Sequence, residues 1–244
     1  MRRPLNARVA VGSTAFFAGQ AVSTVLIATG TLLLAPAPFR QRQRWATLWN
    51  RFNLWWLRLC CGIDWEVEGL EHIPAAPTIV MAKHQSAWET LALVLWFMPQ
   101  CYVLKRELLR IPFFGWALLL MRPIAIDRSR GRKAGQQLLD QGRRRLADGI
   151  WVIIFPEGTR VAPGERGRYH VGGAKLAFAT GSPVVPVAHN AGHCWPRRSF
   201  FKYPGTIRVV IGPPVVPDGL SSTEINRRVE AWIEGTMERL EASE

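Results

Sequence analysis

Several signatures of common enzyme classes are missing from this sequence. It contains no Gly-x-Ser-x-Gly stretch, so the nucleophile turn of a serine hydrolase is unsupported. It also has neither a Walker phosphate loop nor the glycine fingerprint of a dinucleotide-binding turn. Four cysteines occur, but no two are separated by the two residues typical of a zinc or redox pair. We interpret them as free thiols in a reducing compartment.

Acidic residues are scarce relative to basic ones. The 18 Asp and Glu residues face 31 Lys and Arg residues, which leaves a formal net charge of +13. Such an excess favours anionic partners: nucleic acid, an acidic membrane surface or a phosphorylated substrate. Eleven tryptophans, a residue type that prefers membrane–water interfaces, favour the membrane. The basic residues are scattered and no nucleic-acid-binding module is recognised, so we expect no nucleic-acid partner.

Charge is entirely absent from the segment between Val9 and Pro38. A bilayer span needs roughly 20 apolar residues, so this segment is long enough for a membrane anchor. A cleavable signal peptide is the alternative, but the apolar stretch here is longer than usual, which favours an uncleaved anchor. Basic residues flank both ends, so charge does not fix the topology. A spanning helix, a re-entrant segment and an interfacial helix all remain open.

The next stretch, Trp45–Trp65, is aromatic and apolar with few charges. We predict a second helix there that lies in the membrane interface or packs on the first helix; a core helix of the soluble part is the alternative. This gives two regions, membrane-associated helices over residues 1–64 and a globular domain over residues 65–244.

Apolar runs rich in β-branched residues alternate with helical patterns in the second region. The expected strands are Thr78–Ala82, Cys101–Leu104, Ile124–Ile126, Trp151–Phe155, Val184–Val187 and Ile207–Ile211. The expected helices are Trp88–Phe97, Phe113–Met121, Arg132–Ala147, Gly173–Thr180 and a closing amphipathic helix that begins near Ser221. Strands that alternate with helices predict an α/β domain with a mostly parallel central sheet.

The first candidate site is His84, two residues beyond an expected strand, with Glu89 five positions later. A neutral imidazole at a strand end can act as a general base, and a carboxylate on its other nitrogen would orient it. The stretch Ser86–Glu89 also fits a helix capping box, with Ser86 as N-cap. Capping and catalysis are both compatible with these residues.

The second candidate is the Phe-Pro-Glu-Gly-Thr-Arg stretch, Phe155–Arg160, at another strand end. Gly158 permits a tight turn, and the planar guanidinium of Arg160 suits a phosphate. An ordinary turn is the alternative reading. Arg128 and Lys105 are further cations at the ends of expected strands. His189 and His193 lack a carboxylate spaced for a metal site, so we expect no bound metal.

Taken in order, these motifs resemble the glycerolipid acyltransferase family. The resemblance rests on His84-x4-Glu89, Ile126-Asp-Arg128, Phe155–Arg160 and Val185-Pro-Val187, and covers roughly residues 67–212. The first motif of the family usually ends in Asp, where this chain has the longer Glu89.

The resemblance implies a membrane-bound enzyme that makes phosphatidate from lysophosphatidate (1-acyl-glycerol-3-phosphate). The acyl donor would be a thioester of acyl carrier protein or coenzyme A, with no other cofactor. His84 would take the proton of the free glycerol hydroxyl, and Glu89 would orient His84. The implied phosphate-binding residues are Glu157, Gly158, Thr159 and Arg160, with Arg128 and Lys105 nearby. The implied location is the cytoplasmic face of a bacterial inner membrane.

Two other functions fit the same residues. The acceptor could be another lysolipid, such as a lyso-aminolipid, because Arg160 favours a phosphate without requiring one. A non-catalytic lipid-binding protein on the same scaffold is the third hypothesis. The sequence does not determine acyl-chain length, the choice of thioester donor or the oligomeric state.

Overall fold

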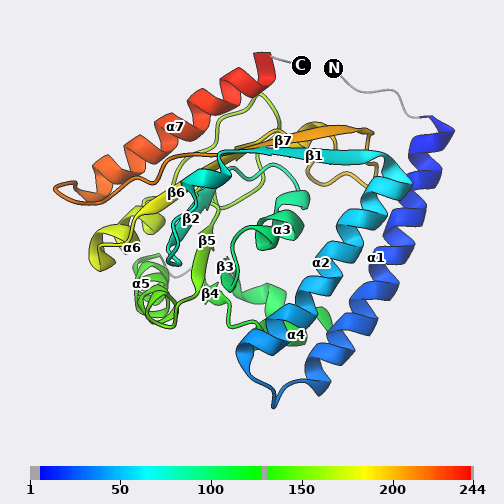
Figure 1. Ribbon diagram of the computed structural model, residues 1–244, viewed down its shortest axis with the longest axis horizontal. Helices are drawn as coiled ribbons and strands as arrows, with labels where there is room; N and C mark the ends of the chain where they lie inside the picture. Colours follow the sequence, from blue (N-terminus) through cyan, green and yellow to red (C-terminus); the bar gives the residue numbers. More distant parts are fainter. Residues whose placement is uncertain (1–5, 128–130, 243–244) are drawn as a thin grey trace.

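The computed structural model describes residues 6–127 and 131–242, and in these residues the strands form one central sheet (Figure 1). The strands are β1 (Ile63–Glu68), β2 (Ile79–Ala82), β3 (Gln100–Lys105), β4 (Ile124–Ile126), β5 (Trp151–Ile154), β6 (Val184–His189) and β7 (Gly205–Ile211). Their order across the sheet is β1-β7-β6-β2-β5-β3-β4. Every neighbouring pair is parallel except β6 and β7. The predicted α/β fold with a mostly parallel sheet is confirmed.

Helices flank the sheet on both sides. They are α1 (Ala7–Leu33), α2 (Phe39–Cys61), α3 (Trp88–Ala92), α4 (Phe114–Leu120), α5 (Arg132–Ala147), α6 (Gly172–Thr180) and α7 (Ser222–Ala242). In Figure 1, α1 and α2 stand side by side along one flank of the sheet, and α5, α6 and α7 lie on the opposite flank. The six predicted strands and the five predicted helices of residues 65–244 are present, most with small shifts at their ends. The helix predicted over Trp88–Phe97 is shorter: α3 ends at Ala92, and a 3₁₀ turn follows over Leu93–Leu95.

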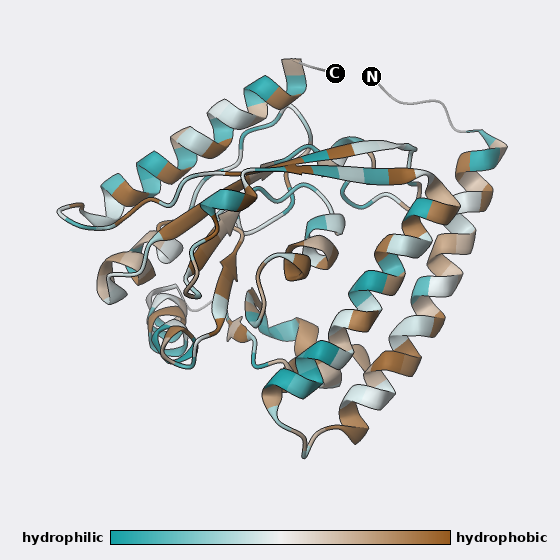
Figure 2. Ribbon diagram, viewed as in Figure 1, coloured by the Kyte–Doolittle hydropathy of each residue, from teal (hydrophilic) through white to brown (hydrophobic). Residues whose placement is uncertain are grey.

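Alternate residues of the central strands pack in two separate hydrophobic cores. In β2, Val80 and Ala82 join the core that includes Phe16 of α1, whereas Ile79 and Met81 join the core that includes Ile233 of α7. This follows from strand geometry, because successive side chains point to opposite faces. The inner strands are apolar on both faces (Figure 2), as expected for a parallel sheet covered by helices on each side.

The hairpin of α1 and α2 is held together by tryptophans. The indole N–H of Trp45 donates to Ile27 O at 3.1 Å, and that of Trp56 donates to Ala15 O at 3.0 Å. Gly19 allows this close approach, since a Cβ there would lie 2.1 Å from Nε1 of Trp56. The two helices therefore pack together as one unit.

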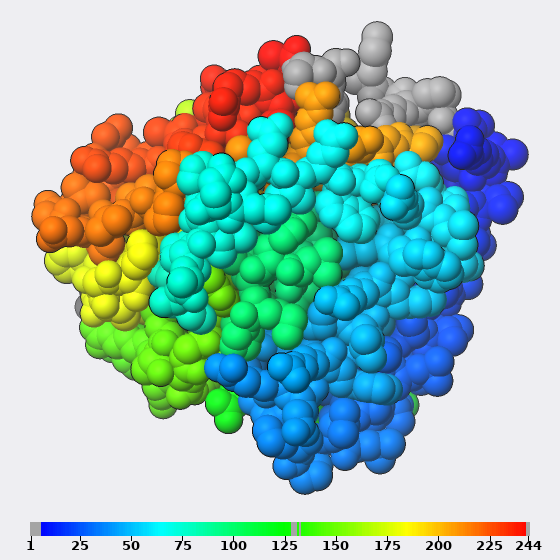
Figure 3. Space-filling model, viewed as in Figure 1, coloured from blue at the N-terminus to red at the C-terminus, as the bar shows by residue number. Residues whose placement is uncertain are grey.

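This hairpin also packs against the sheet-bearing region. The backbone N–H of Lys202 donates to Oγ of Ser13 at 2.9 Å, and the ring of Phe16 lies edge-on to Trp195 with centroids 5.3 Å apart. The space-filling view shows α1 and α2 in continuous contact with the rest of the molecule (Figure 3). The hairpin is thus fixed on the domain along much of its length.

One strand, β1, was not predicted from the sequence. The helix predicted over Trp45–Trp65 starts earlier, at Phe39, and ends at Cys61, because Gly62 adopts a left-handed conformation with φ 65°. Ile63–Glu68 then form β1, which pairs in parallel with β7. The predicted boundary between residues 64 and 65 therefore falls inside β1.

Candidate active site

Two of the predicted motifs meet at the carboxyl ends of neighbouring strands. Lys83 and His84 continue β2, and Phe155–Arg160 continue β5, which pairs with β2. The backbone N–H of Val161 donates to His84 O at 2.8 Å and ties the two loops together. Functional groups in α/β proteins gather at this edge of a sheet, where the strands end and the chain turns outward.

His84 and Glu89 form a direct pair. Nδ1 of His84 lies 2.7 Å from Oε1 of Glu89. The imidazole stacks on the ring of Phe155 at 4.1 Å between centroids, and its side chain is 14% exposed. Because Nδ1 donates to the carboxylate, the neutral tautomer carries its free lone pair on Nε2. That nitrogen is available to accept a proton from a substrate.

The same carboxylate oxygen also accepts hydrogen bonds from the backbone just before the short helix α3. Oε1 of Glu89 accepts hydrogen bonds from the backbone N–H of Ser86 at 2.9 Å and of Gln85 at 3.1 Å. Oγ of Ser86 accepts from the N–H of Trp88 at 3.2 Å. The predicted capping box with Ser86 as N-cap is wrong, because α3 begins at Trp88 with Ala87 as its N-cap and with no side-chain cap hydrogen bond. The predicted pairing of His84 with Glu89 is present, and the amides of Gln85 and Ser86 hold the carboxylate in place for His84.

Glu89 is ionised in this setting. Full burial raises the pKa of a carboxyl group, but the imidazoles of His189 and His84 and the Ser86 amide favour the charged form more strongly, and the pKa of Glu89 is lowered from its ordinary value. A carboxylate held in this way orients the imidazole and stabilises it once it has taken up a proton.

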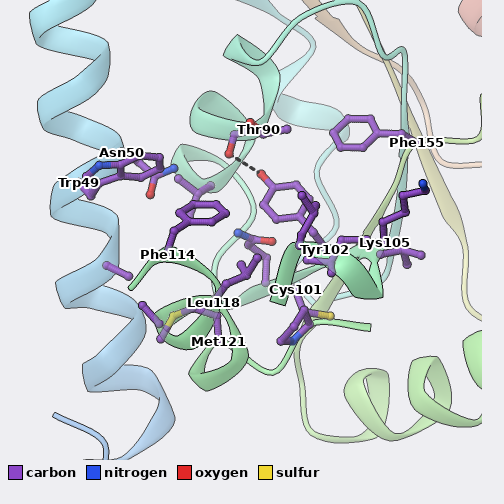
Figure 4. A pocket seen from close by; sticks show the side chains of 18 of the residues that line it. Trp49, Asn50, Thr90, Cys101, Tyr102, Lys105, Phe114, Leu118, Met121 and Phe155 are labelled. Carbon is purple, nitrogen blue, oxygen red and sulfur yellow. Dashed lines mark hydrogen bonds between the residues drawn. The ribbon is translucent and has the colours of Figure 1, made fainter. Parts of the chain in front are cut away.

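His84 lines a cavity of about 680 Å³ between the sheet and the helices α1, α2 and α4. Figure 4 shows Trp49 and Asn50 of α2 on one wall, Phe114, Leu118 and Met121 at α4 on another, and Tyr102 of β3 hydrogen-bonded to Thr90. The lining is mostly apolar and continues along α1 through Ile27 and Ala28. A chamber of this kind suits a hydrocarbon chain.

Cations line the same cavity as His84. Gly158, Thr159, Arg160 and Lys105, four of the predicted phosphate-binding residues, line the cavity. Nε of Arg160 is buried and has no hydrogen-bond partner in the described part of the chain. A buried guanidinium N–H with no protein partner is suited to a bound anion.

Two further arginines at this cavity were missed. Arg197 and Arg198 line the cavity, and Nη1 of Arg197 donates to Arg160 O at 2.8 Å. The sequence signal was the adjacent pair of basic residues after Trp195-Pro196, but a distance of 37 residues from Arg160 hid their relation. The cluster adds positive charge where an anionic headgroup would lie.

Other predicted site residues lie elsewhere. Glu157 does not line the cavity; its carboxylate is buried against Lys83 and the backbone of His84, so the structure places it behind the site. The amide of Gly158 donates to Phe155 O at 3.0 Å within its turn. Arg128 lies outside the described residues.

The described residues contain no group of His, Cys, Asp and Glu that could hold a metal ion. His189 is instead committed to the backbone: Nε2 donates to Lys83 O at 2.8 Å, and Nδ1 accepts from the N–H of Ala191 at 3.3 Å. Both ring nitrogens of neutral His189 therefore have hydrogen-bond partners. Burial lowers the pKa of His189.

Comparison with known proteins agrees with this geometry. A family model described as "Acyltransferase" matches residues 64–190. The chain is 48% identical over 233 residues to a 1-acyl-sn-glycerol-3-phosphate acyltransferase of Pseudomonas aeruginosa, covering 93% of this chain and 91% of that protein. It is 31% identical to the human 1-acyl-sn-glycerol-3-phosphate acyltransferase alpha, over 72% of this chain and 63% of that one.

The fold has a solved counterpart. The crystal structure of the 1-acyl-sn-glycerophosphate (LPA) acyltransferase PlsC from Thermotoga maritima superposes with a TM-score of 0.81 over 96% of this chain and 97% of that chain. The two sequences are 24% identical, so this likeness concerns the fold.

Proposed function

Because the chain belongs to the acyltransferase family, we propose that it transfers an acyl group from a thioester to the free hydroxyl of 1-acyl-glycerol-3-phosphate and so makes phosphatidate. The observation that carries this proposal is the His84–Glu89 pair, with 2.7 Å between Nδ1 and Oε1, on the wall of a mostly apolar cavity. Within one site, Arg160 suits the phosphate of such a substrate and the apolar cavity suits its acyl chain. His84 is the base for its free hydroxyl.

The chemistry follows from the tautomer of His84. Nε2 accepts the proton of the glycerol hydroxyl while its oxygen attacks the thioester carbonyl. Glu89 stabilises the imidazolium that forms. The tetrahedral intermediate then collapses, the carbon–sulfur bond breaks, and the imidazolium returns its proton to the thiolate. The products are the new ester and a free thiol, and no covalent acyl-enzyme is required.

The acceptor phosphate lies against Arg160 in this proposal, with Lys105 and Arg198 adding charge from neighbouring segments. The free Nε of Arg160 supports this assignment. The donor is a thioester of acyl carrier protein or coenzyme A, and the basic excess of the chain favours either anionic carrier. The thioester itself is the only co-substrate that the reaction needs.

The protein works at a membrane surface. Among the described residues, α1 is the helix long and apolar enough to cross a bilayer. However, α1 is hydrogen-bonded to α2 and to Lys202 of the sheet-bearing region, so a transmembrane α1 would draw the domain into the hydrocarbon. The hairpin instead lies in one leaflet, with exposed apolar side chains toward the lipid; these are Val11, Phe17, Val22, Val25, Leu26, Phe52, Trp55 and Leu59. We place it on the cytoplasmic face of a bacterial inner membrane, where both carriers occur.

Acyl transfer by the purified protein in lipid vesicles tests the function. Each labelled donor, acyl-coenzyme A and acyl carrier protein, is crossed with lysophosphatidate and with other lysolipids. We expect lysophosphatidate to be preferred, and His84→Ala to lower kcat by roughly 10²–10⁴-fold, as for the loss of a general base. Near wild-type turnover by His84→Ala contradicts the mechanism. A preference for another lysolipid changes the acceptor, and binding without turnover identifies a lipid-binding protein.

A further inference from the structure

A buried lysine directly precedes the proposed base. The side chain of Lys83 is 1% exposed, and its Nζ lies 2.9 Å from Oε1 of Glu157 and 2.9 Å from Oε1 of Glu234. An ammonium removed from water must be compensated by charge and hydrogen bonds, and these two carboxylates supply that compensation. The mechanism described above gives none of these three residues a part.

The charge network is connected directly to the backbone of His84. Glu157 uses Oε1 toward Lys83, while its Oε2 accepts the backbone N–H of His84 at 2.8 Å. At the other end of the same peptide unit, Lys83 O accepts from Nε2 of His189 at 2.8 Å. Both polar atoms of the Lys83–His84 peptide are thus held by buried side chains that follow or end neighbouring strands.

We propose that Lys83 and Glu234 are positioning residues for acyl transfer, which act through Glu157 to fix the backbone of His84 and hence the direction of its imidazole. The proposal rests on acyl transfer through His84. It does not depend on which lysolipid is the acceptor.

The location of Glu234 argues that this network does more than fill space. Glu234 is on α7, on the opposite flank of the sheet from the cavity, and its side chain is 11% exposed. The other buried residues on this face of α7, such as Val229, Ile233 and Met237, are almost all apolar. Replacing a buried ion pair by well-packed apolar groups is often neutral or stabilising, so packing alone does not require a carboxylate here.

A second contact fixes the Glu234 carboxylate itself. The hydroxyl of Tyr169 donates to Oε1 of Glu234 at 2.7 Å, and the same oxygen accepts from Nζ of Lys83. The Lys83 ammonium also reaches Glu165 O at 3.4 Å. The ammonium is therefore held from three directions, as is required of a group that must hold Glu157 in one orientation.

The test compares Lys83→Met and Glu234→Gln with Glu230→Gln as the matched control. Glu230 lies one helical turn earlier on α7 and pairs with Arg166 at 2.9 Å, away from Lys83. A misplacement of about 1 Å at a reacting group can lower the rate by about 10²-fold. We expect kcat to fall by about 10- to 100-fold in Lys83→Met and by less in Glu234→Gln. KM for the acceptor should stay within about twofold, because Lys83 and Glu234 do not touch substrate in this proposal. Glu230→Gln should match wild type, because Glu230 pairs with Arg166 and not with Lys83.

The double variant Lys83→Met/Glu234→Gln distinguishes a connected network from two separate structural roles. If Glu234 acts through Lys83, the double variant has the same kcat as Lys83→Met alone. Multiplied losses in kcat, or a loss that appears only in KM, overturn the proposal. If Lys83→Met does not fold, Glu234→Gln alone tests the proposal, because it keeps the shape of the side chain. A folded Glu234→Gln with wild-type kcat refutes the positioning role of Glu234. If wild type transfers no acyl group to any acceptor, the proposed function fails instead.

Discussion

The two faces of the central sheet are covered in different ways. One face is covered by α5, α6 and α7, whose apolar residues close over it in a continuous core. The other face is covered by α1, α2, α3 and α4, which leave a cavity of about 680 Å³ beside β3 and expose apolar side chains outward. The same strands serve both faces through alternation of their side chains. Both faces carry an extended apolar core, but the cavity and the proposed base lie on the open face alone.

The largest expected effect comes from the open face. Glu89→Gln keeps the size of the side chain but removes the charge that orients and stabilises His84. By analogy with the loss of charge in a catalytic triad, we expect kcat to fall by about 10³- to 10⁴-fold, measured by acyl transfer with KM for the acceptor nearly unchanged.

Glu89→Asp is the companion variant, because the family's first motif usually ends in Asp. Activity close to wild type would show that the pairing tolerates the loss of one methylene. If Glu89→Gln were as active as wild type, the carboxylate would only hold the backbone before α3, and its proposed part in catalysis would be refuted.

The closed face should give the opposite result. Ile233 is fully buried in the core formed with α7. Ile233→Ala should lower the free energy of unfolding by about 2–5 kcal/mol, while kcat well below the melting temperature stays near wild type. Urea unfolding in detergent measures the first quantity, and acyl transfer measures the second.

Leu118→Ala is the counterpart on the open face. Leu118 is half-buried and already faces the cavity, so its truncation should lower the unfolding free energy by only about 1 kcal/mol. Its main effect should be on the acyl chains that are accepted. Equal destabilisation by the two variants would contradict the division between the faces.

Arg160→Ala tests the charged wall of the cavity. A hydrogen bond to a charged group contributes about 1.5–3 kcal/mol, so kcat/KM for lysophosphatidate should fall by about 10- to 100-fold. Arg228→Ala is the control, because Arg228 is exposed on α7 and pairs with Glu224. An unchanged value for Arg160→Ala would place the phosphate elsewhere.

The smallest effect concerns pH and stability. The pKa of Glu89 is lowered in the folded state, so the stability that it contributes is complete above its ordinary value of 4.5 and is lost as pH falls through the lower folded value. Urea unfolding from pH 6 downward should show wild type losing more stability than Glu89→Gln. Parallel losses in the two proteins would mean that Glu89 is not held as a carboxylate.

Features set by neighbouring residues could be predicted from the sequence. The β-branched runs between prolines and glycines predicted six strands, and the five-residue interval from His84 to Glu89 predicted their pairing. β1 was missed because its alternating apolar residues, Ile63, Trp65 and Val67, directly follow a tryptophan-rich helix that was predicted to continue to Trp65. The strand pairs with β7, 142 residues away.

Features that depend on distant contacts could not be predicted. Glu234 reaches Lys83 across 151 residues, and no local pattern on α7 indicates that this carboxylate turns inward. The walls that α1 and α2 give to the cavity were also missed, because their sequences indicate membrane association or core packing but not that they border a cavity. Tertiary packing decides which polar group is buried and which surface borders a site.

The exposed apolar face of the α1–α2 hairpin has a kinetic consequence. If the hairpin lies in one leaflet, as proposed above, lysophosphatidate reaches the protein by lateral diffusion within the membrane. The effective concentration is then the mole fraction of acceptor in the surface rather than its amount per volume of buffer. Inert lipid added to the vesicles at constant total lysophosphatidate should therefore slow the reaction, as dilution does in three dimensions.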